Sequence, residues 1–130
     1  MNVVVDRSVL IAVVLNEPEK EGIVRATAGH SLIGPESIRW EMGNAFSAMF
    51  KKRRIALRQG QQALAVFESI PIRYVDVDLM HALQLAHDVG IHAYDAYFLE
   101  CALRHRAPLI SLDGLMVEKA KSLGIATLEV

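Results

Sequence analysis

The sequence has a single cysteine, Cys101, and no long apolar run. One thiol cannot form an internal disulfide, and such sparing use of cysteine is typical of a reducing compartment. No stretch approaches the roughly 18 consecutive apolar residues that a membrane span needs. Asp6 and Arg7 interrupt the first apolar run, which argues against a signal-peptide pattern there. These absences predict a cytoplasmic protein that makes no contact with a membrane.

The sequence also lacks an excess of charge of either sign and any histidine pattern typical of a metal site. The chain has 14 Lys and Arg against 15 Asp and Glu, for a net charge of -1. A nucleic-acid partner would therefore need a local basic patch, because the overall charge gives no attraction. The five histidines do not form HExxH or another zinc signature. A zinc site built on histidine is therefore not expected.

The chain is long enough and apolar enough to form one hydrophobic core. It has 130 residues, of which 52% are hydrophobic, so disorder is excluded and one domain over residues 1–130 is expected. We find no linker, internal repeat or low-complexity tract. Apolar patterns predict strands at 2–5, 31–33, 72–77, 108–112 and 125–128, and helices at 8–15, 19–28, 36–52, 57–69, 79–89, 93–106 and 114–123. This alternation predicts an α/β fold with a parallel five-stranded sheet and helices on both faces.

Four acidic residues occupy positions that suggest a common site. Asp6 and Asp113 each follow an apolar strand directly, so both should emerge at the carboxyl edge of the sheet, where ligands bind in such folds. Glu41 borders the apolar face of a predicted helix, and Asp95 lies in the first turn of another. Carboxylates placed close together repel unless a cation lies among them. Oxygen ligands suit Mg²⁺ or Mn²⁺, and such a site can generate hydroxide and attack a phosphodiester.

Four short motifs carry a family resemblance, in the order V-V-V-D-R-S-V-L, E-M-G-N-A-F, Y-D-A-Y-F-L and L-I-S-L-D-G-L. Each motif is weak alone, but the ordered set at this spacing resembles the PIN domain. The chain looks most like the VapC-type toxins of bacterial and archaeal toxin–antitoxin pairs. The resemblance extends from the first predicted strand to the last.

The resemblance implies a metal-dependent ribonuclease whose cofactor is Mg²⁺ or Mn²⁺. Its catalytic and metal-binding acids would be Asp6, Glu41, Asp95 and Asp113. Ser8 matches a hydroxyl residue that supports the metal site in the family, and Ser111 matches one that usually precedes the fourth acid. Such proteins act on RNA, often form homodimers, and are held inactive by a cognate antitoxin whose tail enters the active-site groove.

Several further residues have two interpretations each. Arg7 stands where the family usually has a small residue, so it could bind a phosphate, pair with an acid or point away. Asn44 either orients Glu41 or is a plain residue of the helix face. Lys51, Lys52, Arg53 and Arg54 either complement the negative end of a helix or contact RNA phosphates.

Two other functions are alternatives to a ribonuclease. The first is a catalytically silent PIN-like module that binds RNA or protein, for which Arg7 is the only support in the sequence. The second is a receiver-type signalling domain, which needs an acid pair after the first strand. Here that strand supplies only Asp6, and a shared fold class does not carry a function.

Overall fold

The computed structural model describes all residues, 1–130, and contains a four-stranded parallel sheet. The strands lie in the order β3-β2-β1-β4, and neighbours pair in parallel throughout. The strands are β1 (Asn2–Val5), β2 (Ser31–Pro35), β3 (Ile72–Val75) and β4 (Leu109–Ile110). The helices are α1 (Arg7–Val14), α2 (Lys20–Thr27), α3 (Ile38–Lys51), α4 (Leu57–Ser69), α5 (Leu79–Val89), α6 (Ala93–His105) and α7 (Gly114–Ser122).

The fifth strand predicted at 125–128 is wrong. The segment forms one isolated bridge, in which Leu109 receives a hydrogen bond from Leu128 N and donates its own N–H to Ala126 O, both at 2.9 Å. β4 offers only two residues for pairing, and the chain leaves the sheet after Ile110. A single bridge cannot grow into a ladder because the partner strand has no further residues in register.

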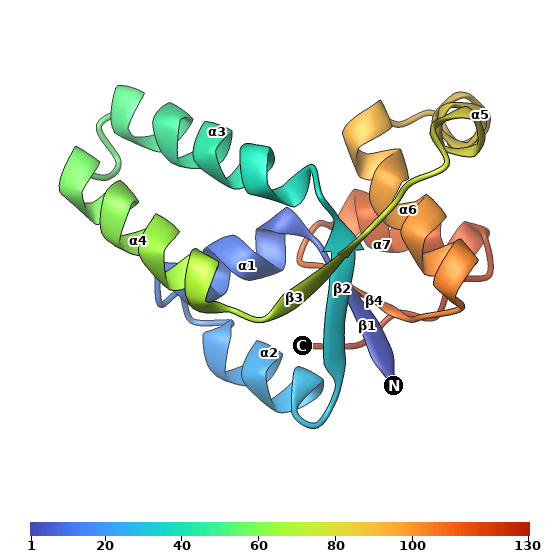
Figure 1. The fold of residues 1–130 in the computed structure, drawn as a ribbon, viewed down its shortest axis with the longest axis horizontal. Helices are drawn as coiled ribbons and strands as arrows, with labels where there is room; N and C mark the ends of the chain where they lie inside the picture. Colours follow the sequence, from blue (N-terminus) through green and yellow to red (C-terminus); the bar gives the residue numbers. More distant parts are fainter.

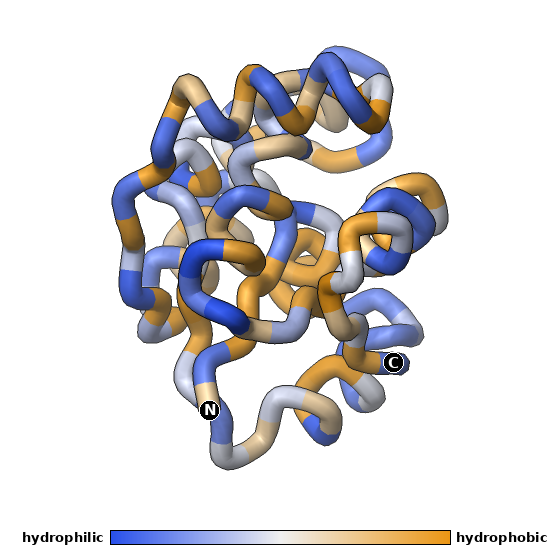
Figure 2. Tube along the Cα trace, turned by 90° about the vertical axis from the view of Figure 1, so that its right-hand side faces the viewer, coloured by the Kyte–Doolittle hydropathy of each residue, from blue (hydrophilic) through white to orange (hydrophobic).

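Helices cover both faces of the sheet (Figure 1). In that view α1, α3 and α4 lie to the left of the strands, and α5, α6 and α7 lie to the right. α6 packs on β1, β2 and β4, while α1 packs on α3 and α4. The tube in Figure 2 shows apolar segments concentrated in the middle of the molecule and hydrophilic ones on the outer turns. The predicted two-sided coverage of a parallel sheet is therefore confirmed.

The core explains why β1 has no polar residue between Asn2 and Asp6. Val3, Val4 and Val5 are almost completely buried, and they belong to a cluster of 27 buried apolar residues. A strand covered on both faces requires a continuous apolar run, and β-branched valine suits it. Asp6 is the first residue beyond this run, so the strand delivers it to the carboxyl edge.

The two ends of α5 match their sequence signals. Asp78 caps the N-terminus by accepting a hydrogen bond from His81 N at 3.1 Å. Gly90 ends the helix in the left-handed conformation, at a φ of 72°, which glycine adopts without the cost that a Cβ imposes.

No helix of the chain is long and apolar enough to cross a bilayer.

Candidate active site

The four predicted acids line one small cavity at the carboxyl edge of the sheet. Asp6 follows β1, Glu41 comes from α3, Asp95 from α6, and Asp113 from the turn before α7. The cavity has a volume of about 20 Å³, which is room for about one water molecule. Its remaining lining residues are Arg7, Ser8, Phe98 and Met116. Because β4, β1 and β2 are neighbours, the segments that follow them converge here.

Asp6 is the most heavily hydrogen-bonded of the acids, and its residue surface is only 4% exposed. Its Oδ1 accepts from Ser8 Oγ at 2.6 Å and from Val9 N at 3.2 Å, so it also caps α1. Its Oδ2 accepts from Ser111 Oγ at 2.5 Å. Burial raises the pKa of Asp6, while the hydroxyls of Ser111 and Ser8 oppose that shift.

The two serines also connect the ends of β1 and β4. Ser8 Oγ accepts from Leu112 N at 2.9 Å, and Ser111 Oγ accepts from Asp113 N at 3.0 Å. Each hydroxyl therefore donates to Asp6 and accepts from the segment that carries Asp113. This arrangement holds Asp6 and the start of α7 in one hydrogen-bonded unit.

Asp113 has a structural role of its own. Its Oδ1 accepts from Leu115 N at 2.9 Å and from Met116 N at 3.3 Å, which caps the N-terminus of α7. Asp113 is exposed, and its charge contributes to raising the pKa of both Asp6 and Asp95. Capping uses one carboxylate oxygen and leaves the other without a partner in the protein.

Glu41 is only 6% exposed and is held by two side chains. Ser37 Oγ donates to its Oε2 at 3.0 Å, and Arg7 Nη1 lies 3.5 Å from its Oε1. Burial raises the pKa of Glu41 to about 7, although Ser37 and Arg7 both act to lower it. The charges of Asp95 and Asp6 raise it further.

The sequence leaves Asn44 either as the residue that orients Glu41 or as a plain residue of the helix face. Asn44 is exposed and makes no hydrogen bond to Glu41, so it is a plain residue of the helix face. Ser37 lies four residues before Glu41, one helical turn away. That spacing is the signal that could have identified it.

Asp95 lies in the first turn of α6, and His92 occupies the N-cap position. It is half-buried, and burial raises its pKa. Arg7 and His92 oppose this shift. The Asp95 carboxylate is half-buried near other acids and does not cap the helix. A bound cation explains a carboxylate in this position better than local structure does.

Arg7 is the one cation among the residues that line the cavity. Its side chain is 43% exposed, whereas the side chain of its partner Glu41 is only 5% exposed. Its charge acts to lower the pKa of Glu41 and of Asp95. Of the three roles that the sequence allows for Arg7, the structure shows pairing with an acid.

The donor set suits a hard divalent cation, because all four acids supply oxygen. Repulsion from the other acids contributes to raising the pKa of Asp6, Glu41 and Asp95. A bound cation would relieve this repulsion. No three acidic, histidine or cysteine side chains are grouped closely enough to hold an ion as they stand. The chemistry fits a metal, and binding one requires the carboxylates to move closer together.

The basic run Lys51–Arg54 is not part of this cavity. It lies at the other end of α3, ten or more residues from Glu41, which corresponds to about 15 Å along the helix axis. All four side chains are exposed.

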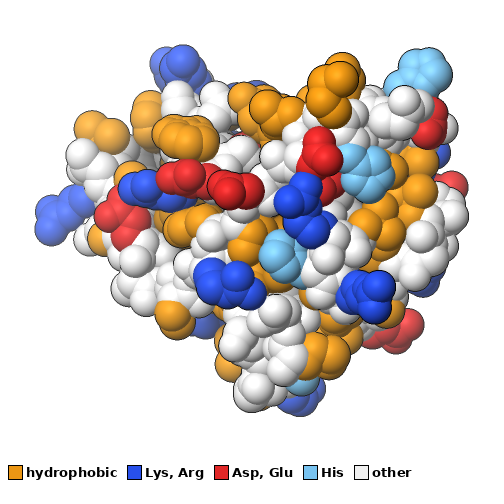
Figure 3. All heavy atoms as spheres, turned by 45° about the vertical axis from the view of Figure 1, so that its right-hand side comes forward, with side chains coloured by type: hydrophobic (Ala, Val, Ile, Leu, Met, Phe, Trp, Pro, Cys, Tyr) orange, Lys and Arg blue, Asp and Glu red, His pale blue; other side chains and the backbone are white.

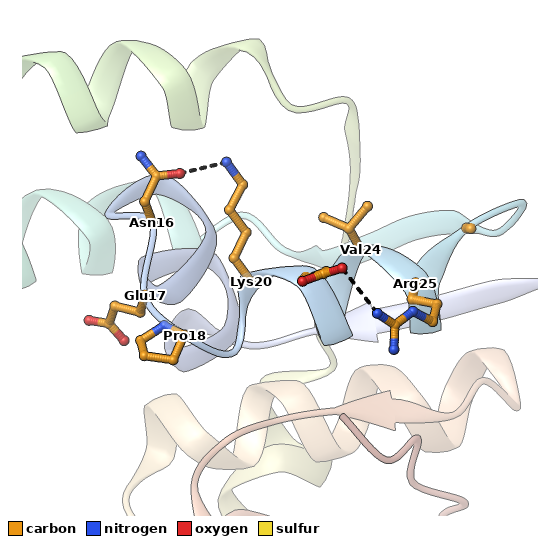
Figure 4. Close-up of a pocket in the computed structure, with 8 residues that line it drawn as sticks. Asn16, Glu17, Pro18, Lys20, Val24 and Arg25 are labelled. Carbon is orange, nitrogen blue, oxygen red and sulfur yellow. Dashed lines mark hydrogen bonds and ion pairs between the residues drawn. The ribbon is translucent and has the colours of Figure 1, made fainter.

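A larger hollow of about 620 Å³ lies between the end of α1 and α2 (Figure 4). Three of its four charged side chains, those other than Glu17, already have partners within the protein. Lys20 Nζ donates to Asn16 Oδ1 at 2.7 Å, and Arg25 pairs with Glu21 at 3.3 Å. A site whose polar groups mostly satisfy each other offers little to a ligand, so we assign it no role.

Comparison with known proteins gives a family match and two similar solved structures. The PIN domain family model matches residues 3–122. The crystal structure of PAE2754 from Pyrobaculum aerophilum is similar, with a TM-score of 0.74 and 20% identity over 98% of this chain and 83% of that one. VapBC2 from Rickettsia felis, bound to a DNA fragment from their promoter, has a TM-score of 0.71 and 13% identity over 99% of this chain and 100% of the matched one. No curated protein matches the sequence.

Proposed function

Because the chain belongs to the PIN domain family, as its four motifs indicated, we propose that it is a metal-dependent endoribonuclease. We further propose that it is the toxin of a type II toxin–antitoxin pair. The observation that carries this proposal is the convergence of Asp6, Glu41, Asp95 and Asp113 on one cavity at the sheet edge. The receiver-type interpretation is excluded by the family assignment.

The acids would hold Mg²⁺ or Mn²⁺, which supplies an activated water and stabilises charge on the phosphodiester. Glu41 is the residue that we assign to accept a proton from the attacking water. Burial raises its pKa to about 7, and a base is most efficient when its pKa lies near the working pH. Ser8 and Ser111 hold Asp6 in a fixed orientation through their hydroxyls. We also assign Arg7, which lines the cavity and has a side chain that is 43% exposed, to bind a phosphate of the RNA.

The test is cleavage of total RNA by the wild-type protein and by Asp6→Asn, with Mg²⁺, with Mn²⁺ and with excess chelator. We expect discrete fragments that require metal and disappear with Asp6→Asn. Asp88→Asn is the control, because Asp88 is an exposed acid on α5, away from the cavity. Metal-dependent cleavage that survives Asp6→Asn would refute the assigned site.

A silent module that binds RNA or protein is the second candidate, favoured by the contact between Arg7 and Glu41. In a silent module the guanidinium would permanently replace the metal. Isothermal titration with Mg²⁺ separates the two functions, since the silent module binds no metal and cleaves nothing. Arg7→Thr should then restore the Mg²⁺ binding that the silent wild type lacks, whereas a nuclease binds Mg²⁺ with Arg7 in place.

We also propose a protein partner, a cognate antitoxin. The similar fold of VapBC2, whose structure includes a bound promoter DNA fragment, supports this partner. The experiment is to purify the chain together with the product of a small neighbouring open reading frame and to measure RNA cleavage. A stable complex with suppressed cleavage is expected, and cleavage at the rate of the isolated chain would argue against it.

A second copy of the chain is the other proposed partner. α5 exposes Leu79, Met80 and Leu83, and apolar side chains also reach the surface on the side shown in Figure 3. Contiguous exposed apolar groups are typical of protein interfaces. Light scattering should give the mass of a dimer for the wild type and of a monomer for Leu83→Lys. A wild-type monomer would refute the proposal.

A further inference from the structure

One face of α3 carries an exposed aromatic residue followed by polar ones. Trp40, Asn44, Ser47 and Lys51 are spaced by four, three and four residues, so they form one row along the helix. We call these four residues the α3 row. It lies opposite the buried face that includes Met42 and packs into the core. Trp40 is 66% exposed, which is unusual for the largest apolar side chain.

The row ends in a dense basic segment. Lys51, Lys52, Arg53 and Arg54 are consecutive, exposed, and free of any ion pair with an acid of the chain. We call these four residues the basic turn. Figure 1 shows that it lies at the outer end of the α3–α4 hairpin, away from the sheet. Four unpaired cations there exceed what complementing one helix end requires.

The first residue of the row is next in sequence to a residue of the acidic cavity. Trp40 precedes Glu41, whose carboxylate lines that cavity, so the α3 row leads from the acids to the basic turn. From Glu41 to Lys51 the helix rises about 15 Å. A stacked strand advances roughly 3.4 Å per nucleotide, so about four to five nucleotides cover this distance.

We propose that the α3 row and the basic turn form a track for single-stranded RNA that leads away from the cleaved phosphate. This inference rests on the proposed function and specifies its substrate: a strand unpaired for about four to five nucleotides on one side of the cut. Trp40 stacks on a base, and the basic turn binds backbone phosphates further along. Aromatic stacking and cationic grooves are the two general means by which proteins hold single strands without reading sequence.

The composition of the row favours RNA over a protein segment. A docked amphipathic helix needs apolar anchors at successive turns. Here only Trp40 is apolar, while Asn44, Ser47 and Lys51 follow it at the next three turns. A single aromatic side chain can stack on a base, and the polar and cationic side chains that follow it can bind the phosphates of the same strand.

The first experiment uses Trp40 as its own reporter, because it is the only tryptophan of the chain. Asp6→Asn without metal binds RNA and cannot cleave it, so binding is observed alone. Mixed-sequence oligonucleotides of 2 to about 12 nucleotides are added. We expect tryptophan quenching, with affinity rising to a plateau near about four to five nucleotides, the length of the track. A blunt duplex of the same length should quench weakly.

The second experiment measures affinity for labelled RNA by anisotropy, again in Asp6→Asn. Trp40→Ala should weaken binding roughly 5- to 150-fold, the worth of one stacked base, and Trp40→Phe should recover part of that affinity. The combined variant Lys51→Gln, Lys52→Gln, Arg54→Gln should lower the dependence of log affinity on log salt by about 0.7 for each phosphate that the protein no longer neutralises. Arg53 is retained because its backbone lies in the left-handed region, at a φ of 57°, where a substitution could disturb the turn itself.

The control carries the same change of charge on other elements: Arg25→Gln on α2, Arg73→Gln on β3 and Lys121→Gln on α7. It should keep the wild-type salt dependence. Unchanged affinity in Trp40→Ala, or equally weakened binding in the two triple variants, would overturn the track. Quenching of Trp40 by the antitoxin alone would assign the row to protein instead.

These outcomes are separable from failure of the proposed function. If the wild type cleaves RNA while Trp40→Ala and the basic-turn variant bind normally, the track is wrong and the nuclease stands. If no variant binds RNA and the wild type cleaves none, both are wrong. Circular dichroism of each variant verifies that it is folded.

Discussion

Ser111 Oγ donates to Asp6 Oδ2 at 2.5 Å, joining residues 105 positions apart in the sequence. The same hydroxyl accepts from Asp113 N. One serine therefore connects the acid after β1 with the acid after β4. The segment after β1 and the segment after β4 are therefore aligned by a contact between two motifs that lie far apart in the sequence.

Ser111→Ala should destabilise the protein, because it leaves a buried carboxylate oxygen of Asp6 without a donor. The expected decrease is about 1–3 kcal/mol in the free energy of unfolding, measured by denaturant titration. The pKa of Asp6 should rise, since the hydroxyl of Ser111 acts to lower it. Ser122→Ala is the control, because its exposed hydroxyl donates only to Lys119 O. Equal decreases in both variants would show that the Asp6 contact contributes nothing particular.

The free energy of unfolding should fall as the pH rises from about 4.5 to about 7. In this window the folded protein keeps a proton on Glu41, whose pKa is about 7 against an ordinary 4.5, and the unfolded chain releases it. The unfolded state then binds fewer protons, so the slope is negative, at up to ~1.4 kcal/mol per pH unit. Asp6 and Asp95, whose pKa values are also raised, act in the same sense.

Glu41→Gln tests the origin of this slope. The variant should be more stable than the wild type at pH 8 and show a flatter profile, in thermal melts recorded with chelator present. Glu118→Gln, a change on α7 outside the cavity, should keep the wild-type profile. An unaltered slope in Glu41→Gln would mean that another group titrates in this range.

Arg7→Ala should tighten the binding of Mg²⁺. The guanidinium lies 3.5 Å from Glu41 and would compete with the proposed metal for the same carboxylate. At pH 8.5, where Glu41 is ionised, we expect roughly two- to fivefold tighter binding, the worth of a partly exposed ion pair. Isothermal titration measures it, with Arg25→Ala as control. Weaker binding in Arg7→Ala would show that the arginine supports the metal site instead of competing with it.

Arg104→Ala should destabilise the protein several times more than Arg25→Ala. Both arginines pair with a glutamate four residues earlier. The partner of Arg104 is Glu100, whose side chain is 2% exposed, whereas the side chain of Glu21 is largely solvated. Removing Arg104 leaves a buried charge with only His81 nearby, at 4.0 Å. Thermal melts at pH 7 compare the two variants, and similar melting temperatures would contradict this reasoning.

The elements of the fold follow largely from local pattern. The valine run and Asp6 predict β1 and its carboxyl-edge acid, because a strand buried on both faces must be apolar until it ends. α4 and α5 begin and end at the predicted residues. The prediction of the last strand is wrong because its pairing depends on β4, which has only two residues, and no local pattern reports the length of a partner.

The sequence by itself determined the identity of the four acids, the hydroxyls beside two of them and the parallel α/β fold. Only the tertiary structure decided how those acids are satisfied: Ser37 in place of Asn44 on Glu41, Arg7 on the same carboxylate, and Ser111 on Asp6. The difference is physical. Burial and helix or strand periodicity are properties of neighbouring residues, whereas hydrogen-bond partners are chosen by which segments the packed sheet brings within about 3 Å of each other.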